Sequence, residues 1–227
     1  MVFATKQGII KKTRLDAYKN VRAAGVIAIN INEGDEVVGV RLTNGHNELL
    51  LANRNGRAVR FDENDVRTMG RVSTGVIGMR LDGGDDEVVG MVCVNDPNTE
   101  TIMVVSENGY GKRSEVEDYR KTARGAKGVK TLAITEKTGR LVAIKVVTDE
   151  NDLMIINKSG VLIRLKVADV RVMGRATQGV RLINLAKKND VIASVCKVMH
   201  SQAEDEDIEE AELADEAVQQ TEPETKD

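Results

Sequence analysis

Residues 65–71 read Asp-Val-Arg-Thr-Met-Gly-Arg, and residues 169–175 read Asp-Val-Arg-Val-Met-Gly-Arg. Each stretch lies between two glycines, the second of which is followed by valine, and this arrangement of glycines occurs four times along the chain. The first glycine of each copy ends a tight turn, and these glycines are Gly8, Gly56, Gly109 and Gly160. The second glycines are Gly25, Gly75, Gly128 and Gly179. Because a fixed period is the signature of a repeat architecture, the sequence predicts four copies of a unit of about 50 residues.

Each unit has the local signals of short antiparallel strands. Runs rich in valine and isoleucine, such as residues 102–105 and 141–147, are separated by Asn-Gly or Ser-Gly pairs, which tolerate the positive φ of hairpin turns. A short turn or single helical turn is predicted between the two glycines of each unit, at residues 15–18, 63–66, 116–119 and 167–170. A rhythm of roughly three to four strands per unit is typical of a propeller-like blade, so we predict an all-β array of four blades. The blades are expected at about residues 1–48, 49–100, 101–152 and 153–200.

The net charge of −3 conceals two parts of opposite sign. Residues 1–200 hold 32 lysines and arginines against 24 acidic residues, whereas residues 201–227 hold 12 acidic residues and one base. A basic body of this kind is typical of proteins that bind polyanions, and the acidic segment could compete for the same surface. Residues 201–227 also lack the apolar content that offsets chain entropy, so we predict a disordered acidic tail there.

The basic residues keep register with the repeat in three sets, which we call columns. The first column stands four positions after each first glycine and contains Lys12, Arg60, Arg113 and Arg164. The second column stands near four positions before each second glycine and contains Arg22, Arg71, Arg124 and Arg175. The third column stands eight positions before the second glycine and contains Arg67, Arg120 and Arg171, with Lys19 as the nearest counterpart in the first unit. Lys127 is a further base beside the second column.

Residues in fixed register would recur at the same height and radius on every blade, so the columns together would form a curved basic band. Arginine suits such a band because its planar guanidinium binds two phosphate oxygens at once. We therefore predict that these residues contact the backbone of bent duplex DNA. The alternative is that individual members are solvated strand and turn residues, some of them paired with Asp65, Asp118 or Asp169 in the same loops.

The chain has three tyrosines, two phenylalanines and no tryptophan. Proteins that bind single strands or RNA generally present aromatic rings for base stacking, and so few rings cannot supply every blade. Duplex DNA is therefore the expected partner. Because no helical recognition element is evident in the sequence, we expect binding without base-specific readout and with a steep dependence on salt.

The sequence predicts no site for catalysis, a metal or a cofactor. The two histidines stand in a turn and after the last strand, with no third partner at ligand spacing. Cys93 and Cys196 occupy the positions that Leu42 and Val146 hold in other units, so both are predicted to be core residues rather than nucleophiles. No apolar run approaches the roughly 20 residues that span a bilayer, and we expect a soluble cytoplasmic protein with no membrane partner.

Several motifs resemble those of a known family. They are Asn-Gly-Tyr-Gly-Lys-Arg-Ser at residues 108–114, Val-Arg-x-Met-Gly-Arg at residues 66–71 and 170–175, Thr-Gln-Gly-Val at residues 177–180, and the acidic tail. Together they resemble the C-terminal domain of bacterial DNA gyrase A. The resemblance implies a β-pinwheel, which is a propeller whose neighbouring blades exchange strands, with a basic perimeter that bends and wraps duplex DNA. In that family, wrapping supports ATP-dependent negative supercoiling by the holoenzyme.

The sequence departs from the family pattern in ways that bear on activity. It has four units where the family domain is six-bladed, and the Gln-Arg-Arg-Gly-Gly-Lys-Gly box is absent, with a degenerate counterpart at residues 124–128. Tyr18, Tyr110 and Tyr119 lie inside blade motifs, so none matches the family's catalytic tyrosine. The resemblance thus implies a chain that is not an enzyme on its own, with ATP and magnesium bound elsewhere in the holoenzyme. The partners it implies are duplex DNA, the rest of gyrase A and gyrase B, and the chain alone is expected to be monomeric and associated with the bacterial nucleoid.

Two other functions stay open at this point. The C-terminal domain of topoisomerase IV is closely related, and the box that would separate it from gyrase is carried on a blade that these four units do not include. A protein-interaction propeller, whose charged perimeter docks acidic partners, would also account for a basic surface on a repeat array.

Overall fold

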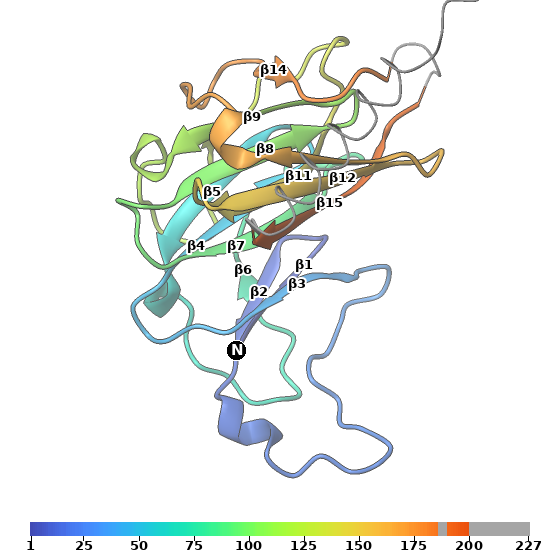
Figure 1. The fold of residues 1–227 in the computed structure, drawn as a ribbon. Helices are drawn as coiled ribbons and strands as arrows, with labels where there is room; N and C mark the ends of the chain where they lie inside the picture. The colour runs from blue at the N-terminus through green and yellow to red at the C-terminus, as the bar shows by residue number, and fades with distance from the viewer. Residues whose placement is uncertain (186–189, 200–227) are drawn as a thin grey trace, which may run out of the picture.

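The computed structural model describes residues 1–185 and 190–199. These residues form four antiparallel β-sheets that are arranged as the blades of a propeller (Figure 1). The all-β class and the fourfold repeat predicted from the sequence are therefore confirmed. The predicted acidic tail at residues 201–227 and His200 lie outside the described residues.

Each blade is built from three longer strands that follow one another along the chain. Blade 1 contains β1 (Val2–Thr5), β2 (Ile9–Lys12) and β3 (Val37–Arg41). Blade 2 contains β4 (Glu48–Asn53), β5 (Arg57–Asp62) and β7 (Val88–Val94). Blade 3 contains β8 (Thr101–Ser106), β9 (Tyr110–Glu115) and β11 (Leu141–Val147). Blade 4 contains β12 (Asn151–Asn157), β13 (Leu162–Lys166) and β15 (Ile192–Met199).

Neighbouring blades exchange a short strand. The segments β6 (Val76–Ile77), β10 (Val129–Lys130) and β14 (Val180–Arg181) each follow the second glycine of their own repeat. Each pairs with the second strand of the preceding blade, so β6 extends the sheet of β2, β10 that of β5 and β14 that of β9. The sheet orders β3-β1-β2-β6, β10-β5-β4-β7 and β11-β8-β9-β14 reflect this exchange, whereas blade 4 has the order β13-β12-β15 among the described residues. We call the boundary between two consecutive blades a junction.

The second glycine of the repeat is required by this exchange. Gly128 has a φ of +77°, and a Cβ built on it would lie 2.3 Å from the carbonyl oxygen of Ala58 on β5. Only glycine permits both the left-handed conformation and the close approach of two backbones. The motif that defined the repeat therefore marks the point where the chain crosses into the neighbouring sheet.

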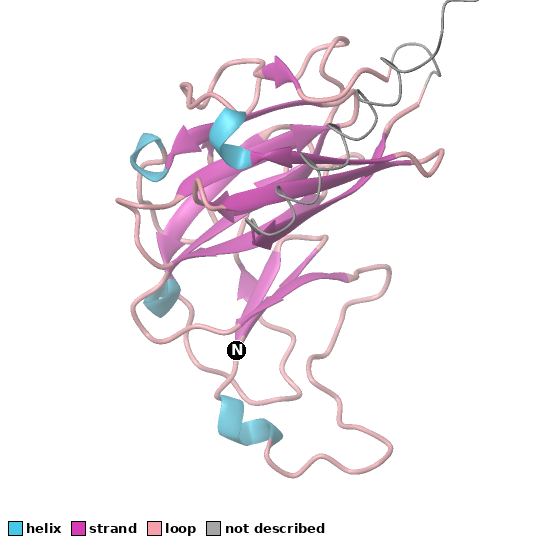
Figure 2. Ribbon diagram, viewed as in Figure 1, coloured by secondary structure: helices cyan, strands magenta, loops and turns pink. Residues whose placement is uncertain are grey.

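A short 3-10 turn follows the second strand of every blade. These turns are η1 (Leu15–Tyr18), η2 (Glu63–Asp65), η3 (Val116–Asp118) and η4 (Val167–Asp169), which confirms the four short turns predicted from the sequence. Figure 2 shows the four turns in cyan. The residue after each of the last three turns, Val66, Tyr119 or Val170, is buried and closes the turn with a backbone hydrogen bond.

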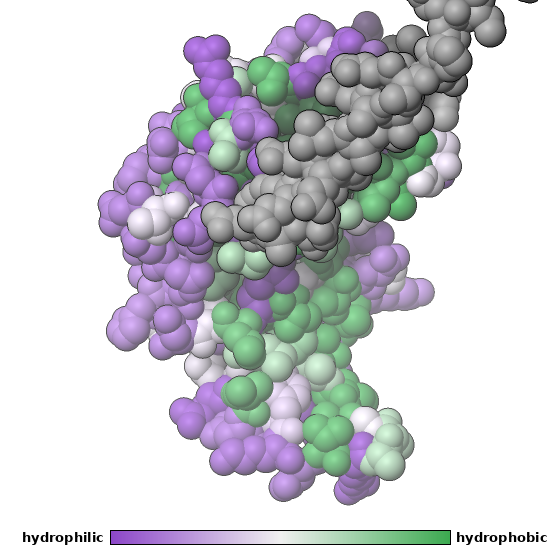
Figure 3. Space-filling model, viewed as in Figure 1, coloured by the Kyte–Doolittle hydropathy of each residue, from purple (hydrophilic) through white to green (hydrophobic). Residues whose placement is uncertain are grey.

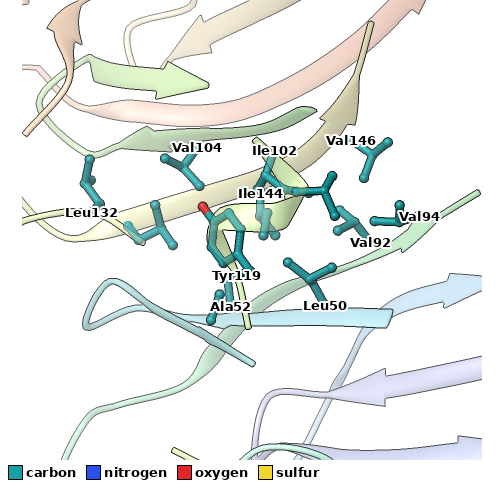
Figure 4. Close-up of a cluster of buried hydrophobic side chains, with 13 residues drawn as sticks. Leu50, Ala52, Val92, Val94, Ile102, Val104, Tyr119, Leu132, Ile144 and Val146 are labelled. Carbon is teal, nitrogen blue, oxygen red and sulfur yellow. The ribbon is translucent and has the colours of Figure 1, made fainter. Parts of the chain in front are cut away.

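The hydrophobic core is divided among the interfaces between adjacent sheets. One cluster joins Leu50 and Val92 of blade 2 to Ile102 and Ile144 of blade 3, with the ring of Tyr119 among them (Figure 4). The Tyr119 hydroxyl lies 2.5 Å from Oγ1 of Thr131, so its polar end is satisfied. Because each sheet buries its faces against its neighbours, the blades stabilise one another rather than folding as separate bodies.

The two cysteines differ in environment. Cys93 is partly buried against the core, but Cys196 is exposed, so the prediction of a core position is wrong for Cys196. In the strand pairing, Cys196 corresponds to Val92, which is buried against blade 3. Among the described residues no further sheet follows blade 4 to cover Cys196 in the same way.

No helix among the described residues is long and apolar enough to cross a membrane. In the same part of the chain, no group of three or more His, Cys, Asp or Glu side chains could hold a metal ion.

Candidate nucleic-acid interface

The third column is exposed and has no side-chain partner in the described part of the chain. Arg67, Arg120 and Arg171 each follow directly on the buried residue that closes a 3-10 turn. The buried neighbour fixes the backbone at the junction, and the next side chain points to solvent. No hydrogen bond or ion pair to another described residue engages these three guanidinium groups, which therefore remain available to an external anion.

The loop that carries the third column is attached to the preceding blade. Thr68, Lys121 and Val172 form parallel bridges to Lys12, Arg60 and Arg113. The next N–H group in each loop, that of Met69, Thr122 or Met173, donates to the carbonyl oxygen of the same first-column residue at 2.8–2.9 Å. The first and third columns thus run beside each other at every junction.

Arg60 of the first column is buried in its junction, with 5% of its side chain exposed. Its Nε donates to Glu48 at 2.5 Å and its Nη2 donates to Glu117 at 2.8 Å. Its Nη1 donates to the carbonyl oxygens of Val116 and Tyr119 at 2.9 and 3.0 Å. Burial opposes the charged form, but the hydrogen bonds that Arg60 donates to Glu117 and Glu48 raise the pKa of Arg60 above its usual value.

Arg113 has the same role at the next junction. Its Nε donates to the carbonyl oxygen of Val170 at 2.6 Å, and its Nη1 pairs with Asp149. Lys12 is the counterpart at the first junction, where Nζ donates to the carbonyl oxygen of Glu63 at 2.8 Å. In all three cases the base donates to a carbonyl group in or just after the following 3-10 turn, and the carbonyl groups of Glu63 and Val116 also accept the N–H that closes their turn.

Arg164 is the last member of the first column. Its Nε donates to Asp152 at 2.7 Å, which repeats the contact of Arg60 with Glu48, and 31% of its side chain is exposed. The outward position predicted for the first column is therefore not found at Arg60 and Arg113. These two residues hold blades together, because the second strand faces the turn of the next blade rather than solvent.

The second column spans the junctions but stays partly exposed. Arg124 donates Nε to the carbonyl oxygen of Asp65 at 2.9 Å and Nη1 to that of Ile77 at 3.0 Å. Arg175 repeats both contacts one blade later, with Asp118 at 3.0 Å and Lys130 at 2.8 Å. Within the described residues the Nη2 groups of both arginines have no hydrogen-bond partner, so each guanidinium is oriented by protein and retains a free donor edge.

The first two members of the second column make fewer contacts. Arg71 donates Nη1 to the carbonyl oxygen of Ile27 at 2.7 Å, which is the equivalent of the Arg124 contact with Ile77. Arg22 is exposed, and its side chain has no hydrogen-bond partner among the described residues. Arg22 therefore lies outside any junction in this part of the chain.

Carboxylates lower the positive charge at two exposed lysines. Lys127, predicted from the sequence, pairs with Asp82 at 2.5 Å. Lys121, which the columns missed, follows Arg120 and pairs with Asp62 at 3.0 Å and with Glu48 at 3.2 Å. Thr68 and Val172 occupy the position of Lys121 in the other blades, so comparison of the repeats gave no signal for it.

An exposed arginine of the third column and a partly exposed one of the second column therefore recur once per junction, as Arg67 with Arg71, Arg120 with Arg124, and Arg171 with Arg175. They lie in the loops that follow η2, η3 and η4, and Figure 2 shows η2 and η3 on the left side of the molecule. In the same view, hydrophilic residues predominate on that side of the surface (Figure 3). This arrangement presents guanidinium groups at a repeated spacing, which suits a ligand with regularly spaced negative charges.

Comparison with known proteins identifies relatives over nearly the whole chain. A family described as the DNA gyrase C-terminal domain, beta-propeller, matches residues 1–44, 47–95, 100–148 and 151–196. The DNA gyrase A protein of Staphylococcus aureus strain MRSA252 is 43% identical over 220 residues, which cover 97% of this chain and 25% of that protein. The chain thus spans about a quarter of the length of the gyrase A proteins that it matches.

Two solved structures share the fold. The crystal structure of the C-terminal domain of DNA topoisomerase IV aligns with a TM-score of 0.81 and 32% identity, covering 87% of this chain and 61% of that one. The structure of a DNA gyrase A C-terminal domain aligns with a TM-score of 0.77 and 28% identity, covering 87% of this chain and 65% of that one.

Proposed function

Because this chain belongs to the DNA gyrase C-terminal domain family, we propose that it binds and bends duplex DNA through the second and third columns. The proposal is supported chiefly by Arg67, Arg120 and Arg171, which are exposed at successive junctions and have no partner among the described residues. In this role the chain is the non-catalytic C-terminal part of a gyrase A protein, and it supports the supercoiling that the holoenzyme carries out.

The chemistry of the interface favours backbone contacts. Guanidinium groups bind phosphate oxygens whatever the base sequence, so the contacts position DNA and do not read it. Arg124 and Arg175 are already held by two carbonyl groups each, so little side-chain entropy is lost when Nη2 binds a phosphate. Because consecutive junctions present the same pair of arginines, a duplex that follows them must curve with the array of blades.

The remaining steps of the activity belong to other parts of the enzyme. The catalytic tyrosine and the ATP site with its magnesium are placed in the rest of gyrase A and in gyrase B, which are the proposed protein partners. The acidic residues 201–227 would compete with DNA for the columns. Deleting them should tighten DNA binding at low salt, and unchanged or weaker binding would count against this role.

The direct test is a comparison of two triple variants in gel-shift and DNA-cyclisation assays. The first, Arg67→Gln/Arg120→Gln/Arg171→Gln, should reduce the slope of log K against log salt by about three and weaken cyclisation of short duplexes. The matched control, Lys6→Gln/Lys137→Gln/Lys158→Gln, removes the same charge from turns and loops outside the columns and should leave both nearly unchanged. Equal losses in the two variants would contradict a defined interface.

A second candidate is the C-terminal domain of topoisomerase IV. Its structure aligns with this chain at a TM-score of 0.81, slightly higher than the 0.77 of the gyrase A domain. Topology assays separate the two, because chiral wrapping by a gyrase domain changes the linking number of relaxed circles when a nicking-closing enzyme is present. An unchanged linking number despite tight binding would favour topoisomerase IV. A protein-interaction scaffold would instead retain protein partners in pull-downs from nuclease-treated lysate.

A further inference from the structure

The innermost strands of the four blades converge on a cavity that the DNA-binding columns do not use. Strand β7 lies against β3 and β11, and β11 lies against β15. Between them is a cavity of about 330 Å³, whose lining includes Arg41, Lys145 and Lys197, and a smaller one of about 180 Å³ that shares Arg41 and Lys145.

The lining residues occupy equivalent positions in the repeat. Arg41, Val92, Lys145 and Cys196 pair with Val2, Leu50, Met103 and Met154, the equivalent residues of the first strand of each blade. Lys197 is the next residue on β15. The repeat therefore directs one side chain from each innermost strand toward the same region, and two of these four side chains are cations.

The cations of this cavity have no carboxylate partner in the described part of the chain. Arg41 donates Nη1 to the carbonyl oxygen of its neighbour Val40 at 2.7 Å, and none of Arg41, Lys145 and Lys197 takes part in an ion pair there. Glu100 is the one acidic residue that lines the larger cavity. Its carboxylate accepts the N–H groups of Asn95 and Asp96 at 2.7 and 3.1 Å, so it is engaged in its own turn.

Burial and mutual repulsion make this arrangement unfavourable when the cavity holds no anion. Lys145 is partly buried, and burial, followed by the charges of Arg41 and Lys197, lowers its pKa from the usual value. Uncompensated cations at a partly desolvated site are costly unless an anion supplies the missing charge. The smaller cavity has no acidic residue in its lining.

We propose that this cavity binds a small, multiply charged phosphate anion such as pyrophosphate through Arg41, Lys145 and Lys197. The guanidinium of Arg41 suits two phosphate oxygens, and the two ammonium groups act as point charges. The cavity is too small to admit a duplex, so the site is separate from the surface proposed for DNA. An anion bound there would bridge blades 1, 3 and 4 and would stabilise their arrangement.

The chain carries its own reporter for this site. It has two cysteines, and burial, followed by the negative charges of Glu63 and Glu100, raises the pKa of the Cys93 thiol to about 11. Cys196 is exposed and lines the larger cavity. A thiol reagent therefore modifies Cys196 in preference to Cys93 near neutral pH, because the thiolate is the reactive form.

The test combines titration calorimetry with the rate of thiol modification on the full chain, using pyrophosphate in a phosphate-free buffer at constant ionic strength. Pyrophosphate should bind with a stoichiometry near one, and it should slow modification of Cys196 by an anionic aromatic disulfide at least about tenfold at saturation. In that reaction the thiolate attacks the disulfide, forms a mixed disulfide and releases a coloured thiolate, and Cys93→Ser should leave the signal unchanged.

Four variants locate the site. Lys145→Met should abolish pyrophosphate binding and protection, and Arg41→Gln on β3 should weaken both even if Lys145→Met impairs folding. The control Lys137→Met removes an exposed lysine outside the cavity and should bind as the parent does. The Arg67→Gln/Arg120→Gln/Arg171→Gln variant should also bind normally. Binding that survives Arg41→Gln and Lys145→Met, or that is lost with the third column, would overturn the proposal without affecting the DNA-binding role.

Discussion

The Nε of Arg124 lies 2.9 Å from the carbonyl oxygen of Asp65 in the preceding blade. Arg175 repeats this contact with Asp118 at the next junction, at 3.0 Å. A residue type chosen from the sequence for DNA binding therefore also ties two blades together. The contact leaves one edge of each guanidinium unpaired, so structural and ligand-binding roles share one side chain.

Replacing Arg124 by lysine tests both roles. Lysine keeps the charge but cannot span the carbonyl groups of Asp65 and Ile77 with the same planar geometry. Arg124→Lys should lower the free energy of unfolding by about 1–2 kcal/mol and should weaken DNA binding, as measured by urea unfolding and gel shift. In Arg120→Lys, where no contact is lost, stability should be unchanged. Equal stability of the two variants would argue against a stabilising role for the contacts of Arg124 with Asp65 and Ile77.

Removing the buried guanidinium of Arg60 should affect folding rather than DNA affinity. Arg60→Gln removes the charged donor to Glu48 and to the carbonyl groups of Val116 and Tyr119, so we expect a loss of about 3 kcal/mol in unfolding free energy. The exposed Arg67→Gln should cost less than about 0.5 kcal/mol. At a temperature where both variants are folded, only Arg67→Gln should weaken DNA binding. A selective loss of affinity in Arg60→Gln would restore the first column as a DNA contact.

The strand exchange can be tested with two glycines of nearly identical conformation. Gly128 and Gly25 have φ values of +77° and +78°, but a Cβ on Gly128 would meet the Ala58 carbonyl oxygen at 2.3 Å, whereas one on Gly25 meets nothing within 4 Å. Both alanine variants share a backbone strain of about 1–2 kcal/mol. Gly128→Ala should lose several kcal/mol more in thermal or urea unfolding, because β10 must move away from β5. Similar stabilities would mean that the exchange tolerates displacement.

Lys112 should make stability depend on pH in the alkaline range. Its side chain is buried beside the carbonyl oxygen of Gly174, at 2.6 Å, and burial lowers the pKa of Lys112 to about 8 from 10.5. Between these values the unfolded chain binds more protons, so the free energy of unfolding rises with pH, by at most about 3 kcal/mol. Compared with the parent chain, Lys112→Met should show a smaller rise in the free energy of unfolding from about pH 8 to about pH 10, as measured by urea unfolding.

The upper limit of that range is set by a second buried group. Burial raises the pKa of Tyr119 to about 12 from 10.0, so above pH 10 the unfolded tyrosine loses its proton first and stability falls again. The difference between the parent and Lys112→Met removes this contribution, since both contain Tyr119. A difference that does not change with pH would show that Lys112 titrates normally.

The repeat made most of the fold predictable. The paired glycines, the short turns between them and the apolar runs are local features, and their spacing reports directly on the backbone. The error at Cys196 came from packing between blades, because an apolar run does not show which of its residues a neighbouring sheet will cover.

The sequence by itself determined that four equivalent all-β units follow one another and that arginines recur in register within them. It could not determine which arginines face solvent, since Arg60 and Arg67 are chemically identical and stand only a few residues apart. That difference depends on the following blade, which covers Arg60 with the carbonyl groups of Val116 and Tyr119 and leaves Arg67 exposed. Contacts between residues distant in the sequence decide the burial of a charge, and only the tertiary structure brings those residues together.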